Sequence, residues 1–316
     1  ETGDILISWS GTLGVFQWYG KTAVLNQHIF KAVFDKLDIN KSYFKYVVEK
    51  GLQDAVKNTH GSTMKHLTKK YFDNIIVSYT SLKEQQKISR KLDLLSKLIS
   101  MRQEQLEELN LLVKSRFNEM FEEYPDSVFL DTYIKELRAG KSLAGEENNK
   151  NKVLKTGAVS YDYFNSSEVK NLPIDYIPLD EHKVEIGDVI ISRMNTSELV
   201  GAAGYVWAIN SDNIYLPDRL WKVILNDRVN PVFLWKLITN EKTKLKIKRI
   251  SSGTSGSMKN ISKSKFLQIR VPLPPLSLQN EFADFVAQVD KSQLAIQKSL
   301  EELETLKKSL MQEYFG

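Results

Sequence analysis

Hydrophobic residues recur at steps of mainly three and four over two long segments, residues 82–122 and 276–316. Adding 194 to a position in the first stripe lands on the second, as for Leu92 and Val286 (286 − 92 = 194). The two stripes comprise Leu92, Leu95, Ile99, Leu106, Leu109 and Val113, and Val286, Val289, Ile296, Leu300, Leu303 and Leu310. This spacing is typical of helices that pair along a narrow seam, so we predict an antiparallel coiled coil. The alternative is that each helix packs only on its own domain.

Shorter apolar runs between turn residues precede each long helix. The pairs Gly3-Asp4 and Gly187-Asp188 each open such a run, which is typical of a turn followed by a strand. Further strands are expected near 75–79, 203–209, 221–225 and 268–271, and helices near 43–57 and 231–246. The mixture predicts an α+β fold with two globular parts, each followed by a long helix.

The chain repeats itself. Residues 64–85 recur as 258–279, and the Gly-Asp openings match at a slightly different offset (187 − 3 = 184). A period this long indicates a duplicated domain rather than a solenoid. Residues 126–186 precede the second Gly-Asp pair, whereas only two residues precede the first. We therefore expect residues 1–81 to hold only the C-terminal part of a first domain, 82–122 a helix, 123–275 a second domain and 276–316 a second helix.

The composition excludes several classes of site and protein. No cysteine is present among 316 residues, so disulfides, thiolate metal sites and cysteine nucleophiles are absent. No apolar run suits a membrane span or a secretory signal, and we expect a cytoplasmic protein. The net charge of +5 is concentrated in one basic run, residues 242–249, followed by a Ser/Gly loop at 251–257. This pattern favours contact with a phosphate backbone, although a solvated helix face is the simpler alternative.

Catalytic patterns are missing from the sequence. It contains no phosphate-binding glycine loop, no methyltransferase motif and no metal-ligand spacing among its four histidines. A loose nuclease pattern, Pro125-Asp126 with Glu168 to Lys170, is common by chance. We predict no metal, no cofactor and no catalytic residue in this chain.

The order of parts resembles the DNA specificity subunit of type I restriction-modification systems. The resemblance rests on the repeated Gly-Asp-hydrophobic-Ser opening, the loop 191–201, the Gly/Ser-Met-Lys loop before an apolar strand, and the related long helices. It implies two target recognition domains, each reading half of a split DNA sequence. It also implies that the paired helices space these domains and dock methyltransferase subunits. Those partners would carry S-adenosylmethionine, and a restriction motor subunit would cut.

Candidate DNA contacts follow from side-chain chemistry, since Arg pairs well with guanine and Asn with adenine. In the second domain they are Arg193, Asn195, Thr196 and Ser197, then Lys248, Arg249, Ser255, Ser257, Lys259 and Asn260, with Tyr161, Tyr163, Asp218, Arg219 and Lys222 as weaker candidates. In the first domain they are Trp9, Ser10, Thr12, His60, Ser62, Thr63, Lys65 and His66. Because Trp-Ser-Gly-Thr replaces Arg-Met-Asn-Thr in the first copy, the two domains should read different sequences. A plain surface loop is the alternative for the Arg193 segment.

The predicted helices are long enough to separate two DNA half-sites. A helix over residues 92–121 would span about 45 Å at about 1.5 Å per residue, comparable with the ~34 Å between half-sites one helical turn apart. Two alternative functions remain open from the sequence. One is a coiled-coil scaffold that does not read DNA, and the other is a reader with its own nuclease activity.

Overall fold

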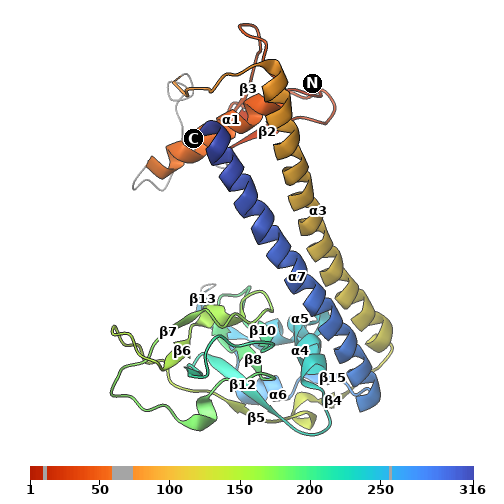
Figure 1. Cartoon of the computed structure of the whole chain (residues 1–316). Coiled ribbons are helices and arrows are strands. Elements are labelled where there is room, and N and C mark those ends of the chain that lie inside the picture. The colour runs from red at the N-terminus through yellow and green to blue at the C-terminus, as the bar shows by residue number, and fades with distance from the viewer. Residues whose placement is uncertain (10–12, 59–73, 256–257) are drawn as a thin grey trace. The chain divides into compact units, whose positions relative to one another are not determined.

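The computed structural model describes residues 1–9, 13–58, 74–255 and 258–316 (Figure 1). Two compact units are present, residues 1–108 with 293–316 and residues 109–292. Two long helices, α3 (Leu82–Phe121) and α7 (Leu276–Phe315), each contribute residues to both units. Each unit therefore combines the start of one long helix with the end of the other.

The second unit is a mixed assembly of short strands and helices. Its main sheet has the order β10-β8-β12-β5, and three smaller sheets have the orders β11-β6-β7, β13-β14-β9 and β15-β4. The strands are β4 (Asp126–Phe129), β5 (Ile134–Arg138), β6 (Lys152–Leu154), β7 (Val169–Asn171), β8 (Val189–Ser192), β9 (Met194–Asn195), β10 (Ala203–Tyr205), β11 (Ile214–Tyr215), β12 (Leu220–Leu225), β13 (Ser252–Ser255), β14 (Met258–Asn260) and β15 (Arg270–Pro272). The helices are α4 (Pro231–Thr239), α5 (Glu241–Ile250) and α6 (Lys263–Leu267), with short 3₁₀ turns at 130–132, 156–159 and 180–182.

Aromatic side chains join the long helices to the core of this unit. Phe121 of α3 lies 4.9 Å from Phe233 of α4, and Phe117 lies 5.5 Å from Phe282 of α7, between ring centroids. All four side chains are buried. The long helices thus pack on each other and on the domain at once, because their apolar faces at these ends serve both contacts.

The first unit has a smaller sheet with the order β2-β1-β3. Its elements are β1 (Ile5–Ser8), β2 (Gly14–Gln17), β3 (Ile29–Lys31) and α1 (Lys41–Asn58). Tyr43 of α1 lies 5.3 Å from Phe315 of α7, and both side chains pack with Leu92 of α3. Since 315 − 121 = 194, Phe315 occupies the place that Phe121 has in the second unit.

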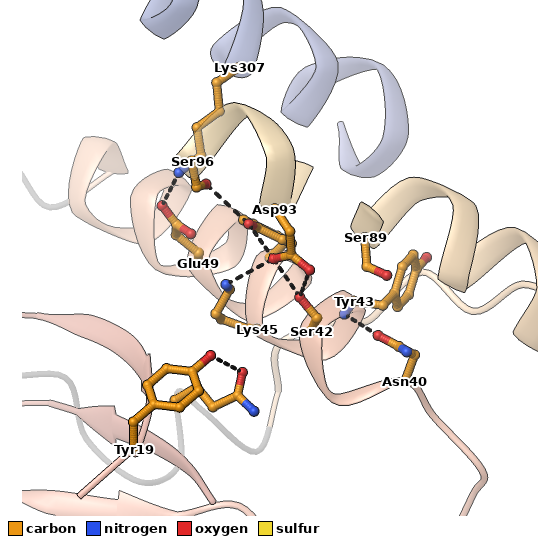
Figure 2. A network of polar contacts seen from close by, with 12 residues as sticks. Tyr19, Asn40, Ser42, Tyr43, Lys45, Glu49, Ser89, Asp93, Ser96 and Lys307 are labelled. Carbon is orange, nitrogen blue, oxygen red and sulfur yellow. Dashed lines mark hydrogen bonds and ion pairs between the residues drawn. The ribbon is translucent and has the colours of Figure 1, made fainter. Parts of the chain in front are cut away.

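A polar network also fastens α1 to the long helices (Figure 2). The Asp93 carboxylate of α3 accepts hydrogen bonds from Ser42 at 2.7 Å and from the Tyr46 hydroxyl at 2.8 Å. Lys307 of α7 forms an ion pair with Glu49 at 3.7 Å. Four of these five side chains retain contact with water. The network therefore fixes where α1 sits on the long helices but contributes little to the free energy of unfolding.

The duplicated Gly-Asp turns have the same geometry. Gly3 and Gly187 have φ values of 88° and 95°, which side chains with a Cβ rarely adopt. Their N–H groups donate to the carbonyls of Trp18 and Val206, at 2.7 and 2.9 Å. The sequence prediction of a turn followed by a strand is confirmed in both copies by β1 and β8.

A buried glutamine is duplicated as well. Gln85 accepts a hydrogen bond from the Asn40 backbone at 2.9 Å, and Gln279 accepts one from the Asn230 backbone at 3.0 Å. Each asparagine caps the next helix, α1 or α4, by accepting from backbone N–H groups. Each glutamine is fully buried. The start of each long helix is therefore fixed to the cap of a helix in its globular part.

The predicted seam residues are all buried or half-buried, and the helices run antiparallel within each unit. Leu92 packs near Met311 in the first unit, while Arg116 forms an ion pair with Glu281 at 3.0 Å in the second. The structure corrects two other predictions. The helix expected near 231–246 is split at Asn240, which caps α5. Residues 75–79 are not a strand, because no described strand pairs with them as β4 pairs with β15.

Candidate nucleic-acid interface

The three-stranded sheet β9-β14-β13 brings together two candidate clusters that lie far apart in the sequence. Asn195 of β9 is directly opposite Lys259 of β14, and Met194 is opposite Asn260. The Arg193 carbonyl accepts a hydrogen bond from the Ile261 backbone at 2.9 Å. We refer to this sheet with Arg193 as the reading ribbon. The major groove of DNA admits a two-stranded β-ribbon, and two adjacent strands of this sheet, β9 and β14, carry Asn195 and Lys259.

Arg193 is held beside a buried aromatic ring. Its guanidinium lies 5.9 Å from the ring centroid of Trp221, whose side chain is fully buried. Its Nε atom is buried and has no hydrogen-bond partner among the described residues. A buried donor without a partner costs free energy, so the hydrogen bonding of Arg193 is incomplete among the described residues.

Asn195 opens the loop that follows the ribbon. Its Nδ2 donates to Ser192 at 3.2 Å, and its Oδ1 accepts from the Thr196 backbone at 2.9 Å. The loop closes at Gly201, whose φ is 80° and where a Cβ would lie 2.5 Å from Ile247. Thr196 and Ser197 are exposed on this loop. The local bonds fix the position of Asn195 but occupy part of its hydrogen-bonding capacity.

Lys259 and Asn260 complete the described part of the ribbon. The Lys259 ammonium donates to the Gly253 carbonyl at 2.7 Å, across the β13-β14 turn. Asn260 Oδ1 is buried and lacks a partner among the described residues. The backbone of Ser255 belongs to β13, its side chain is not described, and Ser257 lies outside the described residues. The ribbon thus carries two cations, Arg193 and Lys259, and amide groups on adjacent strands.

The basic run in α5 separates into two parts. Its first three lysines form ion pairs with carboxylates, namely Lys242 with Glu122, Lys244 with Asp162 and Lys246 with Asp126. Lys248 and Arg249 in the last turn are exposed and occur in none of the described ion pairs. The positive charge available to a ligand therefore lies at the end of α5 that leads into β13.

The weaker candidates fall in different environments. The Arg219 carbonyl accepts from the Arg193 backbone at 3.1 Å, and its side chain is exposed next to the ribbon. Lys222 is buried, with its ammonium 2.9 Å from Asp188 and 2.9 Å from the Lys183 carbonyl. That contact is internal, so we leave Lys222 out of the interface. Tyr161 and Tyr163 are exposed on a separate loop, and Asp218 is bonded to Ser142.

In the first unit, the described residues cover only one candidate. Trp9 is half-buried and its ring is stacked on Phe30, at 5.7 Å between centroids, with His28 at its edge. The remaining candidates, Ser10, Thr12, His60, Ser62, Thr63, Lys65 and His66, lie outside the described residues.

Sequence reasoning did not identify Trp221 and Ser192 as supports of this interface. Both are fully buried, and they orient Arg193 and Asn195 through the contacts above. An apolar strand sequence gave no sign that one of its residues would face a guanidinium. Among the described residues, no three His, Cys, Asp or Glu side chains gather as a metal site, and no helix is apolar and long enough to cross a membrane.

A duplicated α+β module, whose second copy carries a polar ribbon with cations and amides, defines a class of two-module nucleic-acid readers. Comparison with known proteins agrees. Residues 1–111 and 134–307 match the family described as "Type I restriction modification DNA specificity domain", and the chain belongs to this family. This family consists of DNA sequence recognition components of type I restriction-modification systems.

Named relatives and solved structures extend the match. The chain is 24% identical to the MjaVIII specificity subunit of Methanocaldococcus jannaschii, over 98% of this chain and 77% of that protein. It is 23% identical to the EcoKI specificity subunit of Escherichia coli, spanning 81% of this chain and 60% of that subunit. The crystal structure of a type I S subunit from M. genitalium covers 100% of this chain and 83% of its own, with 16% identity and a TM-score of 0.56. A second structure, from work on complex assembly of the type I R-M system, has a TM-score of 0.54 at 16% identity and covers 82% of its own chain.

Proposed function

We propose that this chain reads a bipartite DNA sequence and directs partner subunits to it. The observation that carries the proposal is the reading ribbon, which aligns Asn195 with Lys259 and holds Arg193 beside them. Arg and Asn side chains discriminate bases, whereas Lys neutralises phosphate. The ribbon therefore combines sequence reading with backbone binding on one surface, in the cytoplasm where the DNA lies.

The long helices form the second part of the proposal. Each is 40 residues long and runs from one unit into the other, which suits a spacer between two recognition domains. Division into domains at 1–81, 82–122, 123–275 and 276–316 belongs to this proposal. The exposed helix surface would dock methyltransferase subunits that bind S-adenosylmethionine, and a restriction motor subunit would join them. This chain would supply recognition without catalysis.

Binding to random duplex DNA at 50 and 200 mM salt tests whether the chain is a reader. A protein making 6–10 phosphate contacts should lose about 10³–10⁵-fold in affinity over this range. Methylated adenines mapped in cells that carry the chain with its methyltransferase would give the target. A chain that binds duplex DNA without salt dependence, and leaves no methylation pattern, would contradict the proposal.

Two substitutions separate the roles within the ribbon. Arg193→Ala should relax discrimination at one base position by about 1–3 kcal/mol, because it removes a base contact. Lys259→Ala should weaken binding to all duplexes. It should also lower the slope of log affinity against log salt by about 1, because one phosphate contact is lost. Competition between specific and random duplex measures both. An equal loss on both duplexes for Arg193→Ala would show that it is not a reading residue.

The spacer role is tested by helix length. Seven residues inserted into α3 at its midpoint, with seven inserted at the facing point of α7, preserve the seam spacing of the pair. We expect the distance between the two methylated half-sites to change. If a variant still directs methylation and the distance between the two half-sites is unchanged, the spacer role of the helices is ruled out.

A further inference from the structure

A basic pocket lies in the second unit, apart from the reading ribbon. It is formed between the last turn of α5 and the segment of α6 and β15, and its volume is about 490 Å³. Four cationic side chains line it, Lys246, Arg249, Lys265 and Arg270, above an apolar floor that includes Ile250 and Ile269. Within the part of the chain that the structure describes, its lining includes no carboxylate. We call it the α5–α6 pocket.

Two of the four cations are held in place. The Lys246 ammonium pairs with Asp126 and donates to the Arg270 carbonyl at 2.8 Å. The Arg270 guanidinium lies 4.6 Å from the ring centroid of Phe129. A guanidinium on an aromatic face keeps its N–H groups free to donate at the edge. These contacts position charge at the pocket before any ligand arrives.

The other two cations are not neutralised by the structure that is described. Arg249 and Lys265 are exposed, and neither occurs in the described ion pairs. Counting Asp126 against Lys246 leaves a charge of +3 at the pocket (4 − 1 = 3). Concave surfaces of one sign focus the electrostatic field and attract a ligand of opposite charge.

The pocket adjoins the reading ribbon through the chain. Arg249 lies three residues before Ser252, where β13 begins, so the end of α5 that lines the pocket leads directly into the ribbon. A duplex read by the ribbon carries its phosphates along the groove edges. At the position that matches Arg270, the first unit has Ile76 (270 − 194 = 76), which is 94% exposed and carries no charge.

We propose that the α5–α6 pocket binds a phosphate group, and that this phosphate belongs to the DNA backbone beside the half-site read by the second unit. The inference rests on the proposed function. It adds a contact that positions the duplex but carries no sequence information, since a phosphate is the same at every base pair.

The test compares two double variants of the full chain. Arg249→Ala with Lys265→Ala removes the unpaired pocket charges, and Lys291→Ala with Lys298→Ala removes two exposed charges from α7. Affinity for a random duplex is measured from 50 to 300 mM salt. We expect the pocket variant to lower the slope of log affinity against log salt by about 0.9 to 1.8, and the α7 variant to lower it by less than half as much. Amide exchange of β8 and β12 checks that both variants are folded.

A second arm separates DNA phosphate from free phosphate. Inorganic phosphate is titrated into the wild-type chain at constant ionic strength, with and without duplex, and binding is followed by calorimetry. Weak binding that duplex DNA abolishes supports the inference. Equal slopes for the two double variants would overturn it, as would phosphate binding that DNA does not displace. If the wild-type chain itself shows no salt-dependent DNA binding, the proposed function fails first, which distinguishes the two results.

Discussion

The Gly3-Asp4 turn of the first unit and the Gly187-Asp188 turn of the second share their backbone hydrogen bonds and a lysine partner. Lys31 lies 2.8 Å from Asp4, and Lys222 lies 2.9 Å from Asp188. The two carboxylates differ in their pKa. The hydrogen bond from Lys31 lowers the pKa of Asp4, whereas burial raises the pKa of Asp188 despite Lys222. The two carboxylates are similarly exposed, at 16% and 14%, but Lys31 is 42% exposed and Lys222 only 10%, so the second pair lies deeper in its module.

A second difference lies where each globular part meets its long helix. In the first unit the Tyr46 hydroxyl bonds to Ser96 at 3.1 Å. The matching positions of the second unit hold Lys236 and Asp290 (236 − 46 = 190 and 290 − 96 = 194). Burial lowers the pKa of Lys236 to about 8, and the nearby carboxylates of Asp162 and Asp290 offset only part of this effect. A neutral pair has been replaced by a charged one at an equivalent junction.

A third difference concerns one backbone carbonyl. The Ser78 carbonyl accepts from the Tyr43 hydroxyl at 2.9 Å, and the matching Pro272 carbonyl accepts from the Tyr133 hydroxyl at 2.8 Å. Tyr43 corresponds to Phe233 in the second unit, which has no hydroxyl. The equivalent carbonyl accepts a hydrogen bond from a tyrosine hydroxyl in both units. The tyrosine that donates it comes from a different position of the module in each unit.

The largest effect is expected from breaking the buried ion pair. Lys222→Met leaves Asp188, which is only 14% exposed, without its partner and should cost about 3–5 kcal/mol, because a largely desolvated charge without a partner is poorly stabilised. Amide hydrogen exchange of β8 and β12 measures the loss within the second unit.

The matched control is Lys31→Met in the first unit. We expect a smaller loss of protection in β1 and β3, because Lys31 is 42% exposed and its pair with Asp4 is screened by solvent. Equal losses in the two units would mean that the difference in burial between the turns has no energetic consequence.

An intermediate effect is expected at the shared carbonyl. Tyr133→Phe should destabilise the second unit by about 1–3 kcal/mol, because it leaves the Pro272 carbonyl without its donor. Adding Phe233→Tyr should restore part of this loss, since a hydroxyl at that position reaches the equivalent carbonyl in the first unit. Urea denaturation of the two variants measures both values. No recovery in the double variant would show that the two junctions are not equivalent in detail.

The smallest effect concerns pH. The pKa of Lys236 is about 8 in the folded protein and 10.5 in the unfolded chain. The unfolded chain therefore binds more protons than the folded protein at pH values between these two. The free energy of unfolding of the wild type, relative to Lys236→Met, should therefore rise from pH 9 to 10, by about 1 kcal/mol. Denaturation at the two pH values measures it. A difference that stays constant or falls with pH would contradict this assignment.

Much of the architecture could be predicted from periodicity and repetition. The steps of three and four locate both long helices, and the offset of 194 identifies the duplication, because both features survive in the sequence itself. The split at Asn240 could not be predicted with equal ease, since Asn is also tolerated on a helix surface. Nor could the absence of a strand at 75–79, because a strand requires a partner that a local apolar run does not reveal.

The interface shows a similar division. Side-chain chemistry pointed to Arg193, Asn195 and Lys259, but only the strand register shows that Asn195 and Lys259 face each other. Lysine is a residue type that often contacts DNA, but Lys222 lies inside the unit and pairs with Asp188. Charge alone cannot separate a cation that neutralises a buried acid from one that is offered to a ligand. That distinction depends on contacts made across the fold.

The buried glutamines at the start of the long helices bear on how such chains can be recombined. Gln279 belongs to the helix and bonds to Asn230 of the globular part, as Gln85 does with Asn40. Both modules therefore use the same contact between a helix glutamine and the asparagine cap of the globular part. A graft that replaces the globular part of the second unit with that of a relative therefore has to supply an asparagine cap at the matching position, together with an aromatic partner for Phe117 and Phe121, to fit the existing helices. The scaffold can be kept while the specificity is replaced as a cassette.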